Sequence, residues 1–280
     1  MTYRSKAQRS FNVVGLIPMA GQGTRLRPIP CSKELLPIGY RVTREEGGMR
    51  PKVAAEYLIE KMKLAGVAEA FLILRKGKWD IPAYFGNGSD YEMRLAYLMM
   101  DVPYGPPYSM DEAYTFVRDR IIAFGFADIL FQPDDAFVQL LERQGKSRAD
   151  IILGLLNAYN PEEMDMVEID RQGRVHGIIL KPGHTDLKYA WICAVWNGAF
   201  TEFLHEFLAI KMKNGSNRRA NKTIDASGDL PLGAVIQAAI KNGLSVEGVI
   251  FPQGGYADIG TPKGLLRAVQ SLSGQSLLRR

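Results

Sequence analysis

Residues 15–28 read Gly-Leu-Ile-Pro-Met-Ala-Gly-Gln-Gly-Thr-Arg-Leu-Arg-Pro, an apolar segment that passes directly into a glycine-rich, basic turn. The apolar residues 12–17 predict a buried strand, and the turn that follows offers backbone N–H groups to phosphate oxygens. Glycine lets the main chain approach a ligand closely, and the Arg25 guanidinium can hold a polyphosphate through two hydrogen bonds. The residues expected to bind the nucleotide are Gly21, Gln22, Gly23 and Thr24.

Two glycines at this spacing also occur in ordinary turns, so the turn alone leaves a purely structural role open. A dinucleotide-binding loop is disfavoured because its third glycine would fall at Leu26. Lys33, in the segment Ser32-Lys-Glu-Leu-Leu-Pro37, adds a second positive charge a few residues later. These features together favour a phosphate site after the first strand.

Outward from this turn, short apolar runs alternate with amphipathic stretches, which predicts an α/β fold with a mostly parallel, doubly wound sheet. Helical spacing of apolar residues predicts helices over residues 55–65 and 232–240, ended by Gly66 and Gly243. Strands are expected at residues 12–17, 70–74, 121–126, 151–157, 175–180, 191–196 and 244–251. We expect a single domain over residues 1–280, with residues 1–10 as a flexible tail.

The middle of the chain breaks this alternation. Residues 167–178 form two short strand patterns around the turn Arg171-Gln-Gly173, which predicts an antiparallel hairpin inserted in the α/β plan. Two stretches rich in Gly, Pro and Tyr, residues 84–90 and 103–108, are expected to be loops, either over a site or as plain surface connections.

Composition bounds the class of protein. The chain has 280 residues, of which 46% are hydrophobic and 23% charged, as in ordinary globular proteins. No apolar stretch is long enough to span a bilayer, and the apolar residues 11–20 run into a polar turn rather than a signal-peptide cleavage site. The net charge of +5 is modest and dispersed, so we expect a phosphate-rich small substrate, with no nucleic acid and no membrane as partner.

Cysteine and histidine usage points away from disulfide or zinc chemistry. Cys31 and Cys193 cannot build a disulfide framework and have no metal-type spacing with the three histidines, which favours a reducing, cytoplasmic location. Structural or surface roles are expected for His176, His184 and His205.

Several segments, in order along nearly the whole chain, resemble the sugar-phosphate nucleotidylyltransferases, in particular the glucose-1-phosphate thymidylyltransferases. The matching segments are Gly21-Gln-Gly-Thr-Arg-Leu26, Lys33-Glu-Leu-Leu-Pro37, Gly86-Asn-Gly-Ser89, Phe126-Ala-Asp128, Val167-Glu-Ile-Asp170 with Leu180-Lys-Pro182, and Tyr256-Ala-Asp-Ile-Gly-Thr-Pro262. The resemblance implies a Rossmann-like fold and transfer of a nucleoside monophosphate from a nucleoside triphosphate to a sugar 1-phosphate, with release of pyrophosphate.

The resemblance also implies roles for single residues. Asp128 and Asp258 would bind Mg²⁺, whose preferred ligands are oxygens, and strand ends can bring them to one point. Lys181 would bind the attacking phosphate, while Arg25 and Lys33 would hold the triphosphate and the leaving pyrophosphate. A general base is not required, because the nucleophile is already an ionised phosphate.

This chain also departs from the family pattern at positions tied to specificity. Leu180 replaces a glutamate that contacts the sugar, and Asp165 aligns with a glycine. Met100 lies near the position of a base-reading glutamine, and Ser109 replaces a glycine after a lengthened loop. We therefore expect an altered sugar pocket and leave the base open.

Three functional hypotheses follow. An active sugar-1-phosphate nucleotidyltransferase of polysaccharide, lipopolysaccharide or glycosylation pathways is favoured, because the charged residues of the chemistry are retained together. A catalytically weak, sugar-nucleotide-binding regulator and a transferase for a non-sugar phosphate are the alternatives. Hexapeptide repeats are missing after Ser271, so a second enzymatic activity is not expected. Self-association is common among similar proteins, which leaves a homo-oligomer open.

Overall fold

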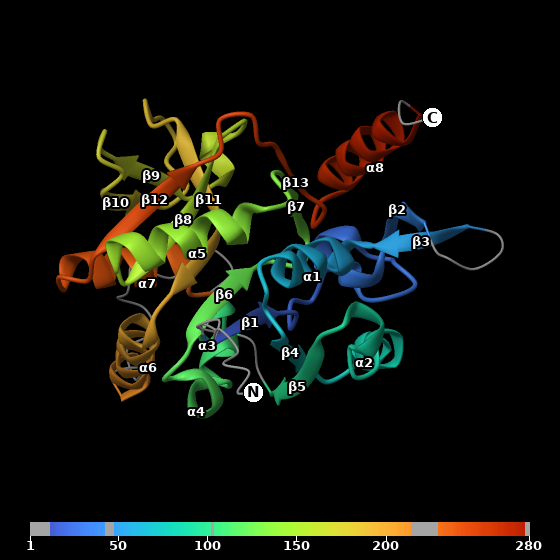
Figure 1. Ribbon diagram of the computed structural model, residues 1–280, viewed down its shortest axis with the longest axis horizontal. Coiled ribbons are helices and arrows are strands. Elements are labelled where there is room, and N and C mark those ends of the chain that lie inside the picture. The colour runs from blue at the N-terminus through green and yellow to red at the C-terminus, as the bar shows by residue number, and fades with distance from the viewer. Residues whose placement is uncertain (1–11, 43–47, 102–103, 214–228, 278–280) are drawn as a thin grey trace, which may run out of the picture.

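The fold is a central mixed sheet with helices on both faces, seen in a computed structural model that describes residues 12–42, 48–101, 104–213 and 229–277 (Figure 1). The expected tail over residues 1–10 and Pro103 of the second expected loop lie outside the described residues. The α/β class predicted from the alternation is confirmed.

The first half of the sheet is parallel. Strand β1 (Val13–Pro18) lies between β4 (Glu69–Arg75) and β6 (Ile121–Gly125), and β5 (Arg94–Met100) extends the sheet beyond β4. Strands β1, β4 and β6 are runs of mostly buried residues because helices cover both faces of a parallel sheet. Parallel order places the ends of β1 and β6 at one edge, from which the glycine-rich turn and Asp128 emerge.

The second half is largely antiparallel, and the antiparallel pairing extends beyond the predicted hairpin to β11 (Tyr189–Trp196). Strand β11 runs antiparallel to β6 and to β8 (Ile151–Asn157), and β12 (Val246–Ile250) pairs with β8 in parallel. The predicted hairpin consists of β9 (Met166–Ile169) and β10 (Val175–Ile179), and β9 also pairs with the start of β11.

Two groups of helices bury the two faces. On one face, α1 (Ala54–Leu64) and α5 (Ala136–Ser147) pack their apolar residues against the sheet. On the other, α3 (Pro106–Asp111), α6 (Gly198–Lys213) and α7 (Leu232–Lys241) share a second core. Both helices expected from the sequence, α1 and α7, are present within one residue or two of the predicted bounds.

Two short ribbons outside the central sheet were not predicted. Strands β2 (Pro37–Val42) and β3 (Met49–Val53) form one, and β7 (Ile129–Phe131) with β13 (Tyr256–Asp258) forms the other. Helix α8 (Pro262–Leu277) packs on both, at the end of the molecule opposite the β9–β10 hairpin (Figure 1).

The two stretches expected to be loops are partly helical, which corrects that expectation. Residues 84–90 include the end of α2 (Asp80–Phe85) and the start of a 3-10 turn, η3 (Ser89–Tyr91). Residues 106–108 begin α3, where two prolines fit the first helical turn because no donor is needed there. A further short helix, α4 (Tyr114–Val117), follows.

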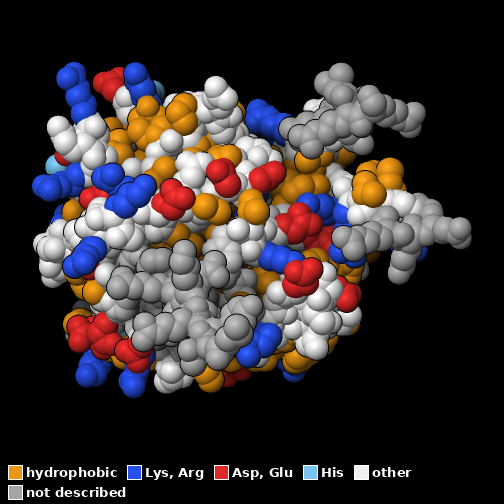
Figure 2. All heavy atoms as spheres, in the orientation of Figure 1, with side chains coloured by type: hydrophobic (Ala, Val, Ile, Leu, Met, Phe, Trp, Pro, Cys, Tyr) orange, Lys and Arg blue, Asp and Glu red, His pale blue; other side chains and the backbone are white. Residues whose placement is uncertain are grey.

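The placement of charged side chains on the surface agrees with the dispersed charge of the sequence. Acidic and basic side chains are interspersed over the face drawn in Figure 2. Among the described residues, no helix has the length and apolar character needed to cross a bilayer.

Candidate active site

The glycine-rich turn lies at the surface directly after β1. Gly23 has a φ of 63°, a left-handed conformation that favours glycine, and precedes the 3-10 turn η1 (Thr24–Leu26). Arg25 is exposed. Lys33, in the 3-10 turn η2 (Lys33–Leu35), lies behind the turn, since a Cβ on Gly21 would be 3.5 Å from its Nζ. The structure therefore brings the predicted phosphate residues of this segment together.

Asp128 and Asp258 converge on the same point, beside Arg25. A Cβ placed on Gly260 would lie 2.9 Å from Asp258 Oδ1, 3.2 Å from Asp128 Oδ2 and 3.1 Å from an Arg25 terminal nitrogen. The route differs from the expected one: Asp258 ends β13, which pairs with β7 directly after Asp128, outside the central sheet. The short β7–β13 ribbon, rather than two strand ends of one sheet, joins the carboxylates.

The charges at this point compensate one another. Lys33 donates from Nζ to Asp128 Oδ2 as an ion pair. Burial raises the pKa of Asp128, but Lys33 outweighs it and holds that pKa below its ordinary value. Burial, followed by the negative charge of Asp128, raises the pKa of Asp258. The Gly260 N–H, which donates to Asp258 Oδ1 at 2.7 Å, acts in the opposite direction. A cation between the carboxylates would relieve this repulsion.

A buried ion pair that was not predicted lies behind Lys33. Lys78 Nζ donates to both oxygens of Glu34, at 2.8 and 2.7 Å, and the two side chains are only 10% and 2% exposed. Burial raises the pKa of Glu34 and lowers that of Lys78. Glu34 lies inside the Ser32–Pro37 motif and could have been predicted from it, whereas no local sequence pattern indicates a role for Lys78.

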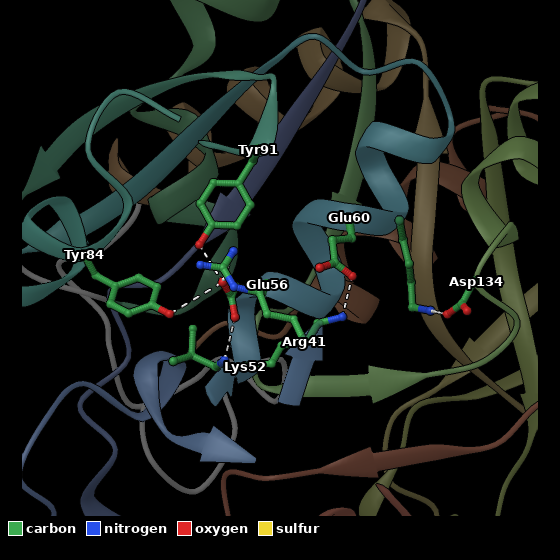
Figure 3. A network of polar contacts seen from close by, with 9 residues as sticks. Arg41, Lys52, Glu56, Glu60, Tyr84, Tyr91 and Asp134 are labelled. Carbon is green, nitrogen blue, oxygen red and sulfur yellow. Dashed lines mark hydrogen bonds and ion pairs between the residues drawn. The ribbon is translucent and has the colours of Figure 1, made fainter. Parts of the chain in front are cut away.

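A second unpredicted network surrounds the carboxylate of Glu56, at the start of α1. Tyr91 donates to it at 2.6 Å, the Val53 N–H at 2.7 Å, and Arg41 lies at 3.2 Å. Figure 3 shows Tyr84 and Tyr91 pointing to this group from the α2 and η3 region. The network ties the Gly86–Tyr91 segment to α1 and β2. A capping-box pattern in the sequence could have predicted the contact between Glu56 and the start of α1. The N-cap residue of α1 is Val53 rather than Ser or Thr, so the sequence does not show that pattern.

The residues expected on the sugar side also meet. Asp165 Oδ2 and Leu180 Cδ2 would lie 2.3 and 2.9 Å from a Cβ on Gly233, at the start of α7. Lys181 is exposed and has a φ of 37°. Burial raises the pKa of Asp165 to about 6, although Lys181 acts to lower it. The backbone at Lys181 is therefore held in an unusual conformation next to a shielded carboxylate.

The remaining positions considered in the sequence differ in exposure and in their partners. Met100 and Ser109 are both buried, and Ser109 Oγ lies 3.0 Å from Met100 Sδ, so neither presents a free polar group. Cys31 and Cys193 are free thiols. His176 pairs with Asp170 in the hairpin, and His205 pairs with Asp111. Within the described ranges, no group of three or more His, Cys, Asp or Glu side chains could hold a metal, so the Asp128–Asp258 pair stands as a two-carboxylate candidate.

Comparison with known proteins gives consistent matches. The profile of a family described as "Nucleotidyl transferase" matches residues 14–275. The chain is 27% identical over 270 residues to the low-salt glycan biosynthesis nucleotidyltransferase Agl11 of Haloferax volcanii, covering 95% of this chain and 68% of that protein. It is 26% identical to a glucose-1-phosphate thymidylyltransferase of Streptomyces antibioticus, over 90% of this chain and 64% of the relative. The chain thus spans about two thirds of the length of these relatives.

Two solved structures share the fold. The UDP-glucose pyrophosphorylase structure determined with UDP-glucose superimposes with a TM-score of 0.72 at 17% identity, covering 94% of this chain and 98% of that chain. UTP-bound UGPase from Acinetobacter baumannii gives a TM-score of 0.68 at 14% identity, covering 95% and 99%. At these identities the similarity establishes the architecture.

Proposed function

The chain belongs to the nucleotidyl transferase family, and from that premise we propose that it transfers a nucleoside monophosphate from a nucleoside triphosphate to a sugar 1-phosphate. The convergence of Asp128, Asp258 and Arg25 around Gly260 carries the proposal. It supplies paired carboxylates for a cation and a guanidinium for phosphate, next to a glycine-rich turn whose residues are largely exposed. Relatives named for sugar-1-phosphate substrates support the same assignment.

The reaction is an in-line displacement at phosphorus. An oxygen of the sugar phosphate forms a bond to the α-phosphorus, and the bond from that phosphorus to the bridging oxygen breaks, so pyrophosphate leaves with the electron pair. Arg25 and Lys33 neutralise the triphosphate, and Lys181 holds the attacking phosphate. Because two anions must approach each other, positioning and charge neutralisation supply most of the rate enhancement.

The residues present fit a hard divalent cation. Asp128 and Asp258 offer oxygen ligands at one point, and burial together with the negative charge of Asp128 raises the pKa of Asp258. Bound Mg²⁺ would supply charge stabilisation for the phosphate oxygens in the transition state. Lys33 already balances Asp128, which keeps the site ordered before ligands bind.

A substrate panel tests the proposal. Each of the four ribonucleoside triphosphates and thymidine triphosphate is paired with glucose, galactose and mannose 1-phosphates and with a phosphorylated alcohol, with and without Mg²⁺. Metal-dependent pyrophosphate release with one sugar phosphate is expected. Nucleotide binding without turnover would favour a regulatory role instead, and turnover confined to the phosphorylated alcohol would favour the non-sugar transferase.

A further inference from the structure

The Lys33 side chain lies between the two ligand-binding features of the candidate site. It runs along the glycine-rich turn, since a Cβ on Gly23 would be 3.8 Å from its Cδ and a Cβ on Gly21 would be 3.5 Å from its Nζ. At its end, the Nζ donates to Oδ2 of Asp128. The ammonium group is therefore next to the turn proposed for the triphosphate and already bound to a carboxylate proposed for the metal.

The oxygen that Lys33 contacts is also the one that lies at the meeting point with Asp258. A Cβ on Gly260 would lie 3.2 Å from Asp128 Oδ2 and 2.9 Å from Asp258 Oδ1. A divalent cation and an ammonium on one oxygen would be no more than about 5 Å apart, so they repel each other. Water screens this repulsion only weakly, because the Lys33 and Asp128 side chains are 14% and 16% exposed. Lys33 and a metal therefore compete for Asp128.

The charges at this point balance before any ligand binds. Among the described residues, two carboxylates, Asp128 and Asp258, meet two cationic groups, Lys33 and Arg25, so their formal charges cancel. A hydrated divalent cation gains little by entering a site with no net negative charge. A triphosphate changes this balance, because it brings several negative charges to the same place.

The backbone of Lys33 is anchored on both sides, whereas its head group can move. The Ser32 N–H and hydroxyl donate to the Asp80 carboxylate at 2.6 and 2.8 Å, and Glu34 accepts two hydrogen bonds from Lys78. A lysine ammonium sits on a flexible four-carbon stem. The Nζ can therefore pass from Asp128 to a phosphate in the turn while the main chain stays in place.

Resting on the proposed function, we propose that the Lys33 ammonium holds the place of the divalent cation in the ligand-free protein and leaves it for the triphosphate, so that the metal binds with the nucleotide and not before it. Removing the Lys33 charge then has two opposite consequences. The freed Asp128 binds a divalent cation more tightly, and the triphosphate loses a cationic partner and binds more weakly. A lysine that only stabilised the fold would not strengthen metal binding when replaced.

Binding of Mn²⁺ alone to the nucleotide-free protein tests the first consequence without requiring turnover. Mn²⁺ takes the oxygen ligands that Mg²⁺ takes, and its electron paramagnetic resonance signal reports the free ion. The wild type is compared with Lys33→Met, with Lys33→Gln as a second neutral variant, and with Lys33→Met combined with Asp258→Asn. Lys52→Met is the matched control, because Lys52 pairs with Glu60 and its side chain is 12% exposed, close to the 14% of Lys33.

Both neutral variants should bind Mn²⁺ about tenfold or more tightly than the wild type, because the ion no longer displaces a charge-assisted hydrogen bond. The double variant should lose this gain, which would place the ion at the Asp128–Asp258 pair. Lys52→Met should bind Mn²⁺ as the wild type does, and thermal unfolding checks that each variant is folded.

Titration of nucleotides in EDTA tests the second consequence. The four ribonucleoside triphosphates and thymidine triphosphate are titrated calorimetrically into metal-free protein. The one that binds the wild type most tightly should bind Lys33→Met about tenfold or more weakly, because a charge-assisted contact to phosphate is lost. Its affinity for Lys52→Met should be unchanged.

The inference is wrong if the wild type binds Mn²⁺ as tightly as Lys33→Met and Lys33→Gln do, or if these variants bind the triphosphate as tightly as the wild type does. In either case metal-dependent pyrophosphate release by the wild type would leave the proposed function standing. Opposite shifts in the two affinities, without pyrophosphate release with any sugar phosphate, would keep the inference and overturn the proposed function. Absence of triphosphate binding by the wild type in EDTA would overturn the inference alone if pyrophosphate is still released with Mg²⁺, and both if it is not.

Discussion

The proposed nucleotide side and the proposed sugar side of the site are built differently. On the nucleotide side, Asp128 is paired with Lys33, and Glu34 is paired with Lys78. On the sugar side, burial raises the pKa of Asp165 to about 6, against Lys181 and a hydrogen bond from Trp191. The first side is therefore held by ion pairs before any ligand binds, whereas the second holds a shielded carboxylate whose charge depends on pH.

The largest effect is expected on kcat from Asp258→Ala, which removes one of the two carboxylates proposed to bind the metal. Stabilisation of the transition state by a bound metal is worth several kcal/mol, so kcat should fall by a factor on the order of 10³. The rate of pyrophosphate release at saturating Mg²⁺ measures this loss, and circular dichroism should show an unchanged fold. Asp119→Ala, at a side chain that is 90% exposed, is the control and should retain full activity. Turnover within a few-fold of wild type in Asp258→Ala would contradict the assignment.

A somewhat smaller effect should follow from breaking the buried pair behind Lys33. Lys78→Met leaves the Glu34 carboxylate, 2% exposed, without its partner, and should lower the free energy of unfolding by about 3 kcal/mol. Chemical denaturation measures the change. The double variant Glu34→Gln with Lys78→Met should be less destabilised than the sum of the single variants.

The matched control for that pair is Lys146→Met. Lys146 lies 3.9 Å from Glu142 on the exposed face of α5, and its side chain is 76% exposed. Solvent screens such pairs, so its loss should change stability by less than about 0.5 kcal/mol. Equal effects of Lys78→Met and Lys146→Met would show that the nucleotide side is not held by its buried charges.

The central sheet was predictable because its strands are buried on both faces. Residues 151–157 form a strand with the predicted bounds, and all seven predicted strands are present within a residue or two at each end. The β2–β3 and β7–β13 ribbons were missed because their pairing is set by tertiary contacts, including those with α8, and not by a local apolar pattern. Strand β5 was missed as well, since its residues vary in burial along the edge of the sheet.

The site was predictable to the extent that its residues sit in short motifs. Asp128, Asp258 and Arg25 could be named from sequence, but their meeting at Gly260 depends on the β7–β13 ribbon. Lys78 pairs with a residue 44 positions away, which no local pattern reveals. The approach of Trp191 to Asp165 likewise depends on the tertiary fold and not on a local pattern.

The smallest effect should be the pH dependence that the shielded Asp165 carboxyl adds to stability. Burial raises its pKa from 3.8 to about 6, so the folded state holds the proton more tightly than the unfolded chain. Its contribution to stability is then fully present below about pH 4 and is lost as the pH rises through 6. Asn cannot ionise, so the free energy of unfolding of Asp165→Asn, relative to that of the wild type, should rise by on the order of 2 kcal/mol between pH 4 and pH 7.

Asp170, in the hairpin turn five residues further on, should show the opposite sign. The N–H of Arg174 and then His176 stabilise its ionised form and lower its pKa. Its contribution to stability is therefore present at neutral pH and lost on acidification, so Asp170→Asn should be less stable than wild type near pH 7 and approach it in acid. Denaturation curves of both variants from pH 4 to 7 check that the two effects on stability depend on pH in opposite directions. A flat difference between Asp165→Asn and wild type over this pH range would mean that the Asp165 carboxyl is solvated rather than shielded by burial.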